Sequence, residues 1–249
     1  MSGQRTTVEL EIALLAAEEA LRVRDDFMRL AGHELRSPLT AVQLQADALV
    51  LLARQGAPPD AIEERAERVR RSVHRLAWLV EEVVDLSRAV GGRLILHAAT
   101  TDLVLMAHRV LDRFGPELRR AGCDARIDTT SPVLGSWDAT RLEHAIGSLL
   151  LSAMKRGGRI EVEVHGEIET ARLAVRDGGP GLAEDERALV FDSFERLLAG
   201  LQPGSSALGL WLARAVAEAH GGQLSLEPGR AELRLPKTGP ARPGLIGET

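Results

Sequence analysis

Residues 31–41 read AGHELRSPLTA and lie within a long helical pattern that decides the fold. Apolar residues around this stretch follow one another in alternating steps of four and three, with Arg24 as the one break. The stripe consists of Leu10, Leu14, Ala17, Leu21, Met28, Ala31 and Leu35, and beyond Pro38 it continues with Leu39, Val42, Ala46, Leu49 and Ala53. This spacing is typical of a coiled-coil seam, so we predict a long helix over residues 8–54.

A second helix with the same spacing follows after a short break. The stretch QGAPP at residues 55–59 interrupts the pattern, Asp60 can cap a new helix that runs to about Arg88, and Gly91 and Gly92 can end it. Two long helices joined by a short turn form a helical hairpin. Pairing of two such hairpins in a four-helix bundle would bury both apolar stripes, so the sequence predicts a homodimer.

The rest of the chain mixes helical apolar spacing with strand-like alternation, a pattern that predicts an α+β domain. We expect helices over residues 101–121, 138–156 and 208–219, and strands over 159–165, 171–175, 223–227 and 231–235. The tail from Pro236 to Thr249 is rich in proline and glycine, which is typical of disorder.

Composition narrows the class of protein. The 249 residues carry a net charge of −5, with 45% apolar and 27% charged residues, which is ordinary for a globular chain and gives no reason to expect nucleic acid as a partner. No apolar run approaches the roughly 18 residues of a membrane span, and the N-terminus lacks the apolar core of a secretory signal. The one cysteine, Cys123, excludes a disulfide framework. We therefore expect a cytoplasmic protein.

The residues that could carry chemistry occur in short groups. His33 lies off the apolar stripe, where a neutral imidazole nitrogen can act as a nucleophile, and Glu34 could accept the other ring N–H. Residues 177–182 read DGGPGL and residues 204–210 read GSSALGL, turns at which a nucleotide base and phosphates could bind. Each group also has an ordinary explanation: a solvated histidine, a tight turn and a capped loop.

The order of these groups resembles the sensor histidine kinases of two-component systems. AGHELRSPLTA is similar to the family's H-box, and VFDSFERL at 190–197 and HGG at 220–222 follow in the family's order. The resemblance implies an α+β chain in which a helical hairpin forms a dimeric four-helix bundle, followed by an α/β-sandwich ATP-binding domain of the histidine kinase, gyrase and Hsp90 type. The implied segments are a coiled-coil linker at 1–24, the dimerisation and phosphotransfer hairpin at 25–92, the ATP-binding domain at 93–236 and a disordered tail at 237–249.

The resemblance also implies a role for each matching residue. His33 would be the phosphoacceptor, Glu34 its general base and Ser37 the hydroxyl that positions water for dephosphorylation of a response regulator. Asp177 would read adenine. The other residues implied in nucleotide binding are Ser148, Ser152, Lys155, Gly179, Gly181, Phe191, Phe194, Arg196, Gly204, Gly209 and Leu210.

Departures from the family cluster where ATP phosphates and metal would bind. The family carries two Asn residues four apart, the second a magnesium ligand, where this chain has Ser148 and Ser152. Ser205 and Ala207 replace two further loop glycines, and each adds a Cβ where backbone would approach phosphate closely.

We therefore expect a protein-histidine kinase that uses ATP and Mg²⁺, with the metal at Ser152, phosphorylates His33 and passes the phosphoryl group to an aspartate of a response regulator. Phosphatase activity is a further expectation. The expected partners are a second copy of the chain, a receiver domain and a separate sensor protein. The departures leave an alternative open, a pseudokinase that acts as a dimeric phosphotransfer or scaffolding module. A chaperone or mismatch-repair type of ATPase is a further alternative, against which the H-box argues.

Overall fold

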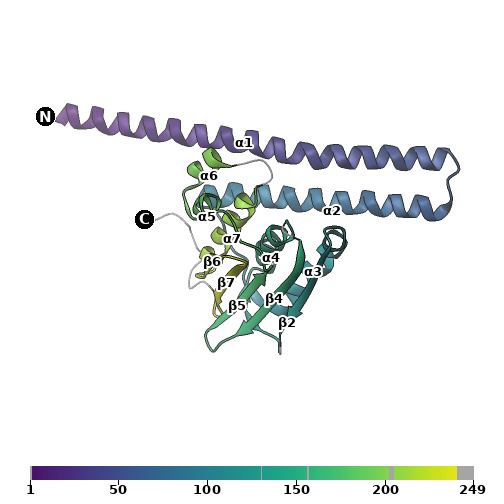
Figure 1. Cartoon of the computed structure of the whole chain (residues 1–249). Coiled ribbons are helices and arrows are strands. Elements are labelled where there is room, and N and C mark those ends of the chain that lie inside the picture. The colour runs from purple at the N-terminus through teal and green to yellow at the C-terminus, as the bar shows by residue number, and fades with distance from the viewer. Residues whose placement is uncertain (1, 130, 156, 202–204, 240–249) are drawn as a thin grey trace. The chain divides into compact units, whose positions relative to one another are not determined.

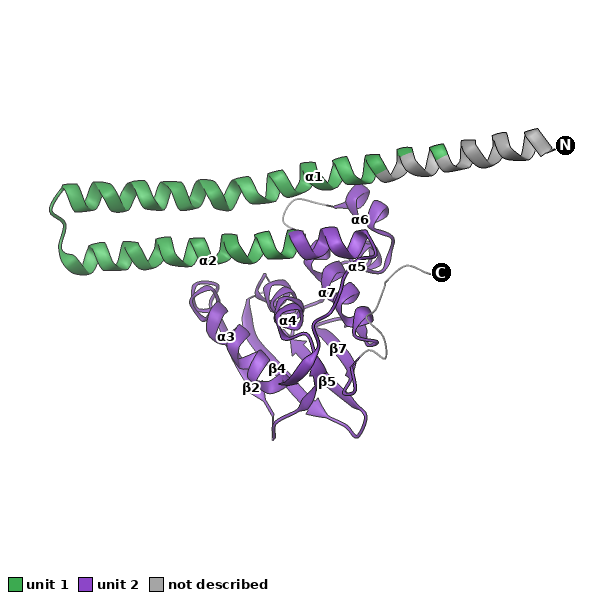
Figure 2. Ribbon diagram, turned by 180° about the vertical axis from the view of Figure 1, so that it is seen from behind, with its two compact units in different colours: residues 1–83 green, residues 84–249 purple. Residues whose placement is uncertain are grey.

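The computed structural model describes residues 2–129, 131–155, 157–201 and 205–239, and Figure 1 shows its elements. The chain divides into two compact units, Met1–Val83 and Val84–Thr249 (Figure 2). The boundary between the units falls inside a helix, so the last residues of that helix belong to the second unit. Disorder is expected for the tail at residues 237–249, and residues 240–249 of it lie outside the described part.

The first unit is the predicted hairpin. Helix α1 spans Ser2–Arg54 and continues through Pro38, and α2 spans Pro59–Val90 with Asp60 in its first turn. Gly56 has a φ of 68°, a left-handed conformation that glycine adopts without strain, and it turns the chain between the helices. Arg65 on α2 donates a hydrogen bond of 2.8 Å to Gln45 on α1. No helix in the described residues has an apolar stretch long enough to cross a membrane.

The apolar stripe of α1 divides into two sets. Leu14, Leu21 and Met28 are 59%, 50% and 62% exposed. Ala31, which the sequence places in the same stripe, is instead buried together with Val23 and Phe27. Because a large exposed apolar surface on a helix is unfavourable in water, the exposed set is available for a further partner. The side chains of Leu10 and Ala17 lie outside the described part.

The second unit is a two-layer α/β domain. Its main sheet has the strand order β2–β4–β5–β7–β6, in which β2 and β4 are parallel and the other neighbours are antiparallel. A separate two-stranded sheet pairs β1 with β3. The strands are β1 (Ala99–Asp102), β2 (Cys123–Asp128), β3 (Leu134–Trp137), β4 (Gly158–Gly166), β5 (Thr170–Arg176), β6 (Gln223–Glu227) and β7 (Arg230–Pro236).

Three helices cover one face of the main sheet, as Figure 1 shows. They are α3 (Leu103–Arg120), α4 (Ala139–Met154) and α7 (Ala207–Ala219), and two shorter helices, α5 (Glu184–Phe191) and α6 (Phe194–Gly200), precede α7. Fully buried aliphatic side chains such as Leu142, Ile160 and Leu173 fill the space between the layers. The aliphatic core agrees with the near absence of aromatic residues from the chain.

The expected elements of this domain are confirmed, and the described residues contain five further ones: β1 before the first expected helix, and β2, β3, α5 and α6 between the others. The predicted strand at 223–227 has the bounds of β6, and the other expected helices and strands differ by a few residues at their ends. β1, β2 and β3 are short or strongly polar, so they show little apolar alternation. α5 and α6 lie between the DGGPGL and GSSALGL segments and include most of the VFDSFERL stretch.

Candidate functional site

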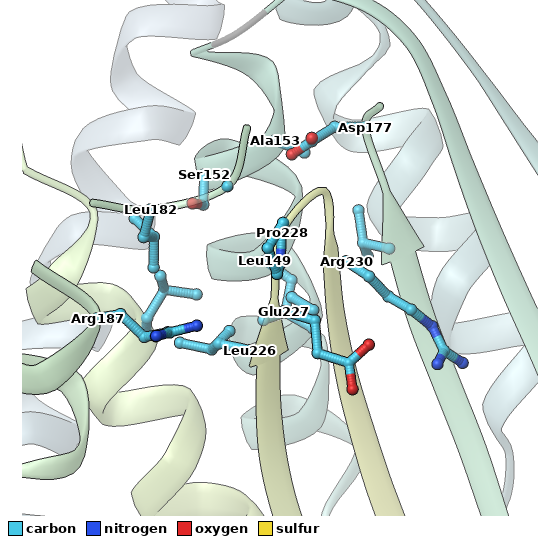
Figure 3. Close-up of a pocket in the computed structure, with 14 residues that line it drawn as sticks. Leu149, Ser152, Ala153, Asp177, Leu182, Arg187, Leu226, Glu227, Pro228 and Arg230 are labelled. Atoms are coloured by element: carbon cyan, nitrogen blue, oxygen red, sulfur yellow. The ribbon is translucent and has the colours of Figure 1, made fainter. Parts of the chain in front are cut away.

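A pocket lies in the second unit where α4, the turn after β5 and the turn between β6 and β7 meet (Figure 3). It brings together four of the predicted nucleotide-binding residues. These are Ser152, Asp177, Gly181 and Leu210. The lining combines aliphatic side chains with a few polar and charged ones, which suits a flat heteroaromatic base with polar edges. Its other lining residues are Leu149, Ala153, Val175, Leu182, Arg187, Leu226, Glu227, Pro228, Arg230 and Ala231.

Asp177 directly follows the end of β5 and is only 8% exposed. One of its carboxylate oxygens accepts a hydrogen bond of 2.8 Å from the N–H of Gly179. Its own backbone N–H donates to the carbonyl of Gly229 at 3.1 Å. In Figure 3 the carboxylate is turned toward Ala153 on α4. A buried carboxylate held in this way can accept a hydrogen bond from an exocyclic amino group of a base.

Two glycines let the backbone turns beside Asp177 approach each other closely. Gly181 has a φ of 81°, and a Cβ on it would lie 2.8 Å from the Cα of Pro228. Gly229 has a φ of 68°, and a Cβ on it would lie 2.9 Å from the carbonyl oxygen of Gly179. Since neither position has room for a side chain, this end of the pocket depends on both glycines.

Ser152 on α4, next to Ala153, also lines the pocket and is 4% exposed. One turn earlier, the Ser148 hydroxyl donates back to the carbonyl of His144 at 3.1 Å and does not line the pocket. Lys155 caps the end of α4 and is exposed. The structure therefore brings Ser152 to the pocket but not Ser148 or Lys155.

Ser152 does not fit the magnesium position that the resemblance implies. Magnesium needs near-octahedral oxygen ligands at about 2.0–2.1 Å, and the hydroxyl of a serine reaches less far from α4 than the carbonyl oxygen of the Asn found there in the family. Among the described residues, no group of three or more His, Cys, Asp or Glu side chains could hold a metal ion.

Three charged residues at the pocket were missed in the sequence. Arg187 on α5 lines it beside Leu182, and Glu227 and Arg230 flank the Pro228–Gly229 turn. Arg230 forms an ion pair with Glu232 on the same strand. The Pro-Gly pair predicts a turn, but no local signal shows that this turn packs on the DGGPGL segment. Arg187 is a cation at the pocket where ATP would bring negative charge.

Three predicted nucleotide-binding residues of the VFDSFERL stretch, Phe191, Phe194 and Arg196, are divided between core and surface. Phe194 is 4% exposed and packs on Trp211 of α7, with ring centroids 5.0 Å apart. Phe191 is exposed, and Arg196 forms an exposed ion pair of 3.2 Å with Asp192. None of these residues lines the pocket. Phe194 therefore attaches this segment to α7.

The predicted phosphate loop leads into the N-terminus of α7. Ser205 and Ser206 are half-buried and Ala207 is buried. The hydroxyl of Ser205 and the backbone N–H of Ser206 both donate to the carboxylate of Glu186 on α5. Gly204 lies outside the described residues, Gly209 lies in the first turn of α7, and Leu210 lines the pocket.

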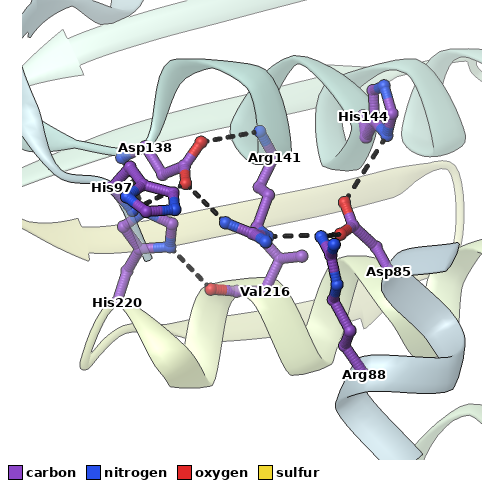
Figure 4. Close-up of polar contacts among 8 residues, drawn as sticks. All are labelled: Asp85, Arg88, His97, Asp138, Arg141, His144, Val216 and His220. Atoms are coloured by element: carbon purple, nitrogen blue, oxygen red, sulfur yellow. Dashed lines mark hydrogen bonds and ion pairs between the residues drawn. The ribbon is translucent and has the colours of Figure 1, made fainter. Parts of the chain in front are cut away.

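A buried polar network holds the N-terminus of α4 (Figure 4). Asp138 is the N-cap, and its carboxylate accepts from the backbone N–H groups of His97 at 2.9 Å and Arg141 at 3.2 Å and from the Arg141 guanidinium at 2.6 Å. Burial alone would raise the pKa of Asp138, but these donors and the charge of Arg141 lower it overall. Asp138 is therefore held in its ionised form, and it caps the N-terminus of α4, the helix that carries Ser152.

His220 connects α7 to this network. It is fully buried, its Nε2 accepts from the backbone N–H of Asp138 at 3.0 Å, and its Nδ1 lies 2.7 Å from the carbonyl of Val216. This pattern fits a neutral ring with the proton on Nδ1. Burial lowers the pKa of His220, although the bond to Val216 and the charge of Asp138 act in the opposite direction. The histidine therefore joins the N-terminus of α4 to the C-terminal end of α7.

The last residues of α2 contact the same network. Asp85 is 7% exposed, and its carboxylate lies 3.4 Å from Nε of Arg141 and 3.4 Å from the Arg88 guanidinium. Leu86, which follows it, is also buried. These contacts are internal to the second unit, which begins at Val84.

The H-box residues lie on α1 in the first unit. His33, Glu34 and Ser37 are all exposed, as expected of side chains off the buried face. Glu82 on α2 is a carboxyl that the sequence did not single out. Burial, and secondarily the charge of Glu34, raise its pKa to about 7. A titratable acid therefore lies within electrostatic reach of Glu34.

Comparisons with known proteins agree with this division. The family model described as "His Kinase A (phospho-acceptor) domain" matches residues 23–92, and the one described as "Histidine kinase-, DNA gyrase B-, and HSP90-like ATPase" matches residues 137–239. The fold and pocket thus define a phosphoacceptor hairpin joined to an ATP-binding domain of this class. The chain belongs to the sensor histidine kinases.

Individual relatives support the same family. The chain is 34% identical over 235 residues to the signal transduction histidine-protein kinase/phosphatase MprB of Mycolicibacterium smegmatis, covering 90% of this chain and 46% of that protein. It is 30% identical over 248 residues to the sensor protein kinase PmrB of Pseudomonas aeruginosa, covering 93% of this chain and 50% of the relative. The chain thus spans about half the length of these curated relatives.

Solved structures show the same fold. The Acinetobacter baumannii histidine kinase AdeS matches with a TM-score of 0.51 at 23% identity, over 83% of this chain and 97% of that one. The histidine kinase ThkA in complex with the response regulator protein TrrA matches with a TM-score of 0.55 at 20% identity, over 90% of this chain and 65% of that one.

Proposed function

We propose that this chain is the catalytic core of a two-component system, which binds ATP in the second unit and phosphorylates His33 in the first. The observation that carries the proposal is the pocket in which buried Asp177 lies beside aliphatic side chains such as Leu149 and Val175, within a chain that also exposes the H-box histidine. Relatives named as kinases over 90% or more of this chain support the active form over the pseudokinase.

The reaction is a phosphoryl transfer in two steps. One ring nitrogen of His33 attacks the γ-phosphorus of ATP, an N–P bond forms, the bond to the β-phosphate oxygen breaks, and ADP leaves. Glu34 accepts the proton of the other ring nitrogen, which makes His33 more nucleophilic. An aspartate carboxylate of a response regulator then takes the phosphoryl group from the histidine. Positioning supplies most of the acceleration, because this chemistry needs little beyond alignment and charge neutralisation.

Each end of the pocket has its own task in this proposal. Asp177 accepts a hydrogen bond from the adenine amino group, while Arg187 and the loop before α7 face the phosphates. Because Ser152 stands where the family has a metal-binding Asn, nucleotide binds with little gain from Mg²⁺. Ser37 keeps a hydroxyl beside His33, and this supports phosphatase activity toward the regulator, an activity that the name of the relative MprB includes.

The partners follow from the same features. The exposed apolar residues of α1, together with Val73 and Val80 of α2, form the face through which a second copy completes a four-helix bundle. The response regulator docks by its receiver domain, as the complex of the relative ThkA with TrrA supports. A separate sensor protein is a further candidate partner. ATP and response regulators are found in the cytoplasm, so we place this core there.

The test is labelling of the purified chain with γ-labelled ATP, with the oligomeric state measured by light scattering. Wild type should form a dimer and acquire label that is lost in acid and survives in base. His33→Gln should acquire none while remaining a dimer. His74→Gln, which removes another exposed hairpin histidine, is the matched control and should label like wild type. Label that persists in His33→Gln would refute the assignment, and an unlabelled wild type that still binds ADP would favour the pseudokinase.

A further inference from the structure

The start of α7 is occupied by a side chain of the same domain. Glu186 on α5 accepts hydrogen bonds from the Ser205 hydroxyl and from the backbone N–H of Ser206, the latter at 3.2 Å. The Ser205 hydroxyl oxygen in turn accepts from the N–H of Ala207 at 2.9 Å. One carboxylate thereby engages a hydroxyl and a backbone N–H of the loop and, through Ser205, a second N–H.

These are donors that an anion would use. The first N–H groups of a helix have no partner within the helix, and they carry the positive end of its dipole. Phosphates bind at such helix starts for this reason. Ser206 is the N-cap of α7, but its own side chain makes no capping hydrogen bond. The Glu186 carboxylate therefore has the charge and the contacts of a phosphate group at this loop.

We propose that Glu186 is an internal competitor for the ATP phosphates, a latch that must leave the loop before they can bind. This inference rests on the proposed function, since it takes the Ser205–Ala207 loop as part of the phosphate site. The latch depends on the departure at Ser205, because the glycine found there in the family has no hydroxyl to donate to Glu186.

The residue next to Glu186 indicates how ATP would release the latch. Arg187 lines the nucleotide pocket while Glu186 holds the loop, so neighbouring positions of α5 carry opposite charges to the two places that ATP must reach. Phosphates that attract Arg187 would repel Glu186. Entry of ATP thus favours release of the carboxylate from Ser205 and Ser206. Adenosine, which has no phosphates, does not need this release.

The inference predicts a specific change in nucleotide preference. Glu186→Gln keeps an acceptor of similar shape but removes the charge, and Ser205→Gly removes the hydroxyl and leaves the charge. Each should strengthen ATP binding without Mg²⁺ by about 5- to 10-fold, the difference between a charged and a neutral hydrogen bond, and leave adenosine binding unchanged. Glu184→Gln, an exposed acid in the first turn of α5, is the charge-matched control and should resemble wild type.

Calorimetry with ATP and with adenosine, in a chelator at constant salt, measures both affinities. A gain for ATP alone in Glu186→Gln and Ser205→Gly supports the latch. Unchanged or weaker ATP binding in both variants overturns it. If Glu186 only stabilised the Ser205–Ala207 loop, its removal would leave ATP binding unchanged or weaken it. Tight adenosine binding with no gain for ATP would thus reject the latch while leaving the proposed nucleotide site intact. Failure of every variant to bind either compound would instead refute the nucleotide site itself.

Discussion

The proposed adenine and phosphate ends of the pocket are built differently, the first by closely packed backbone turns and the second by individual side chains. At the adenine end, Asp177 is buried, and Gly181 and Gly229 bring two turns so close that neither tolerates a Cβ. At the phosphate end, Ser152 and Ser205 stand where the family has Asn and Gly, and a carboxylate of the same domain holds the loop. In the proposed function, base recognition is therefore fixed by backbone packing, whereas phosphate recognition depends on a few side chains that can change without disturbing the fold.

The largest effect is expected at the adenine end. Asp177→Asn replaces a charged acceptor by an amide that would turn either oxygen or NH₂ toward the base. Loss of a hydrogen bond to a charged group costs about 1.5–3 kcal/mol, so ADP affinity should fall by roughly 10- to 150-fold. Calorimetry without Mg²⁺ measures this change, and Asp185→Asn on the exposed start of α5 is the control. If Asp177→Asn binds ADP as wild type does, the comparison between the two ends fails.

A smaller effect of opposite sign is expected at the phosphate end. Ser152→Asn restores a longer side chain with a carbonyl oxygen, which can reach a metal ion that serine cannot. We expect several-fold tighter binding of ATP in the presence of Mg²⁺, little change in its absence, and faster labelling of His33. Ser148→Asn alone should do less, because Ser148 does not line the pocket. Tight binding of MgATP by the wild type, with no gain in Ser152→Asn, would show that another residue holds the metal.

The smallest effect concerns the stability of the fold at low pH. The lowered pKa of buried His220 means that the unfolded chain takes up a proton first as the pH falls below the ordinary value of 6.5. The contribution of neutral His220 is therefore complete above that pH and is lost below it. Thermal unfolding should show a decline in stability from about pH 6.5 downward that is weaker in His220→Gln. His165→Gln, on an exposed position of β4, should decline like wild type, and equal slopes in all three proteins would contradict the assignment.

The sequence predicted the features that depend on local pattern. The four/three spacing gave the hairpin, and alternation in RIEVEVH gave β4. Contacts between distant segments could not be predicted in the same way. The packing of Gly229 on Gly179 joins segments that lie 50 residues apart in the sequence. The hydrogen bond between His220 and Asp138 joins two other segments, 82 residues apart. The exposure of Met28 and the burial of Phe27 also needed the structure, because adjacent helix positions are both apolar.

The candidate site was predicted in part for the same reason. Motif order pointed to Asp177 and Ser152, which the structure brings to one pocket. It missed Arg187 and Glu186, since each is an ordinary charged residue of a short helix with an acidic first turn. Only the fold shows that these two neighbours contact different parts of the site.

The position of Asp85 has a consequence for anyone who exchanges domains between sensor kinases. The obvious place to join a foreign hairpin is the Gly91–Gly92 turn, because it ends α2 and looks like a linker. A chimaera joined there would keep Arg141 but lose the native Asp85 and Leu86, so the buried guanidinium would keep Asp138 and lose the other of its two carboxylate partners. A crossover before Val84 instead transfers the end of the helix together with the domain that it belongs to.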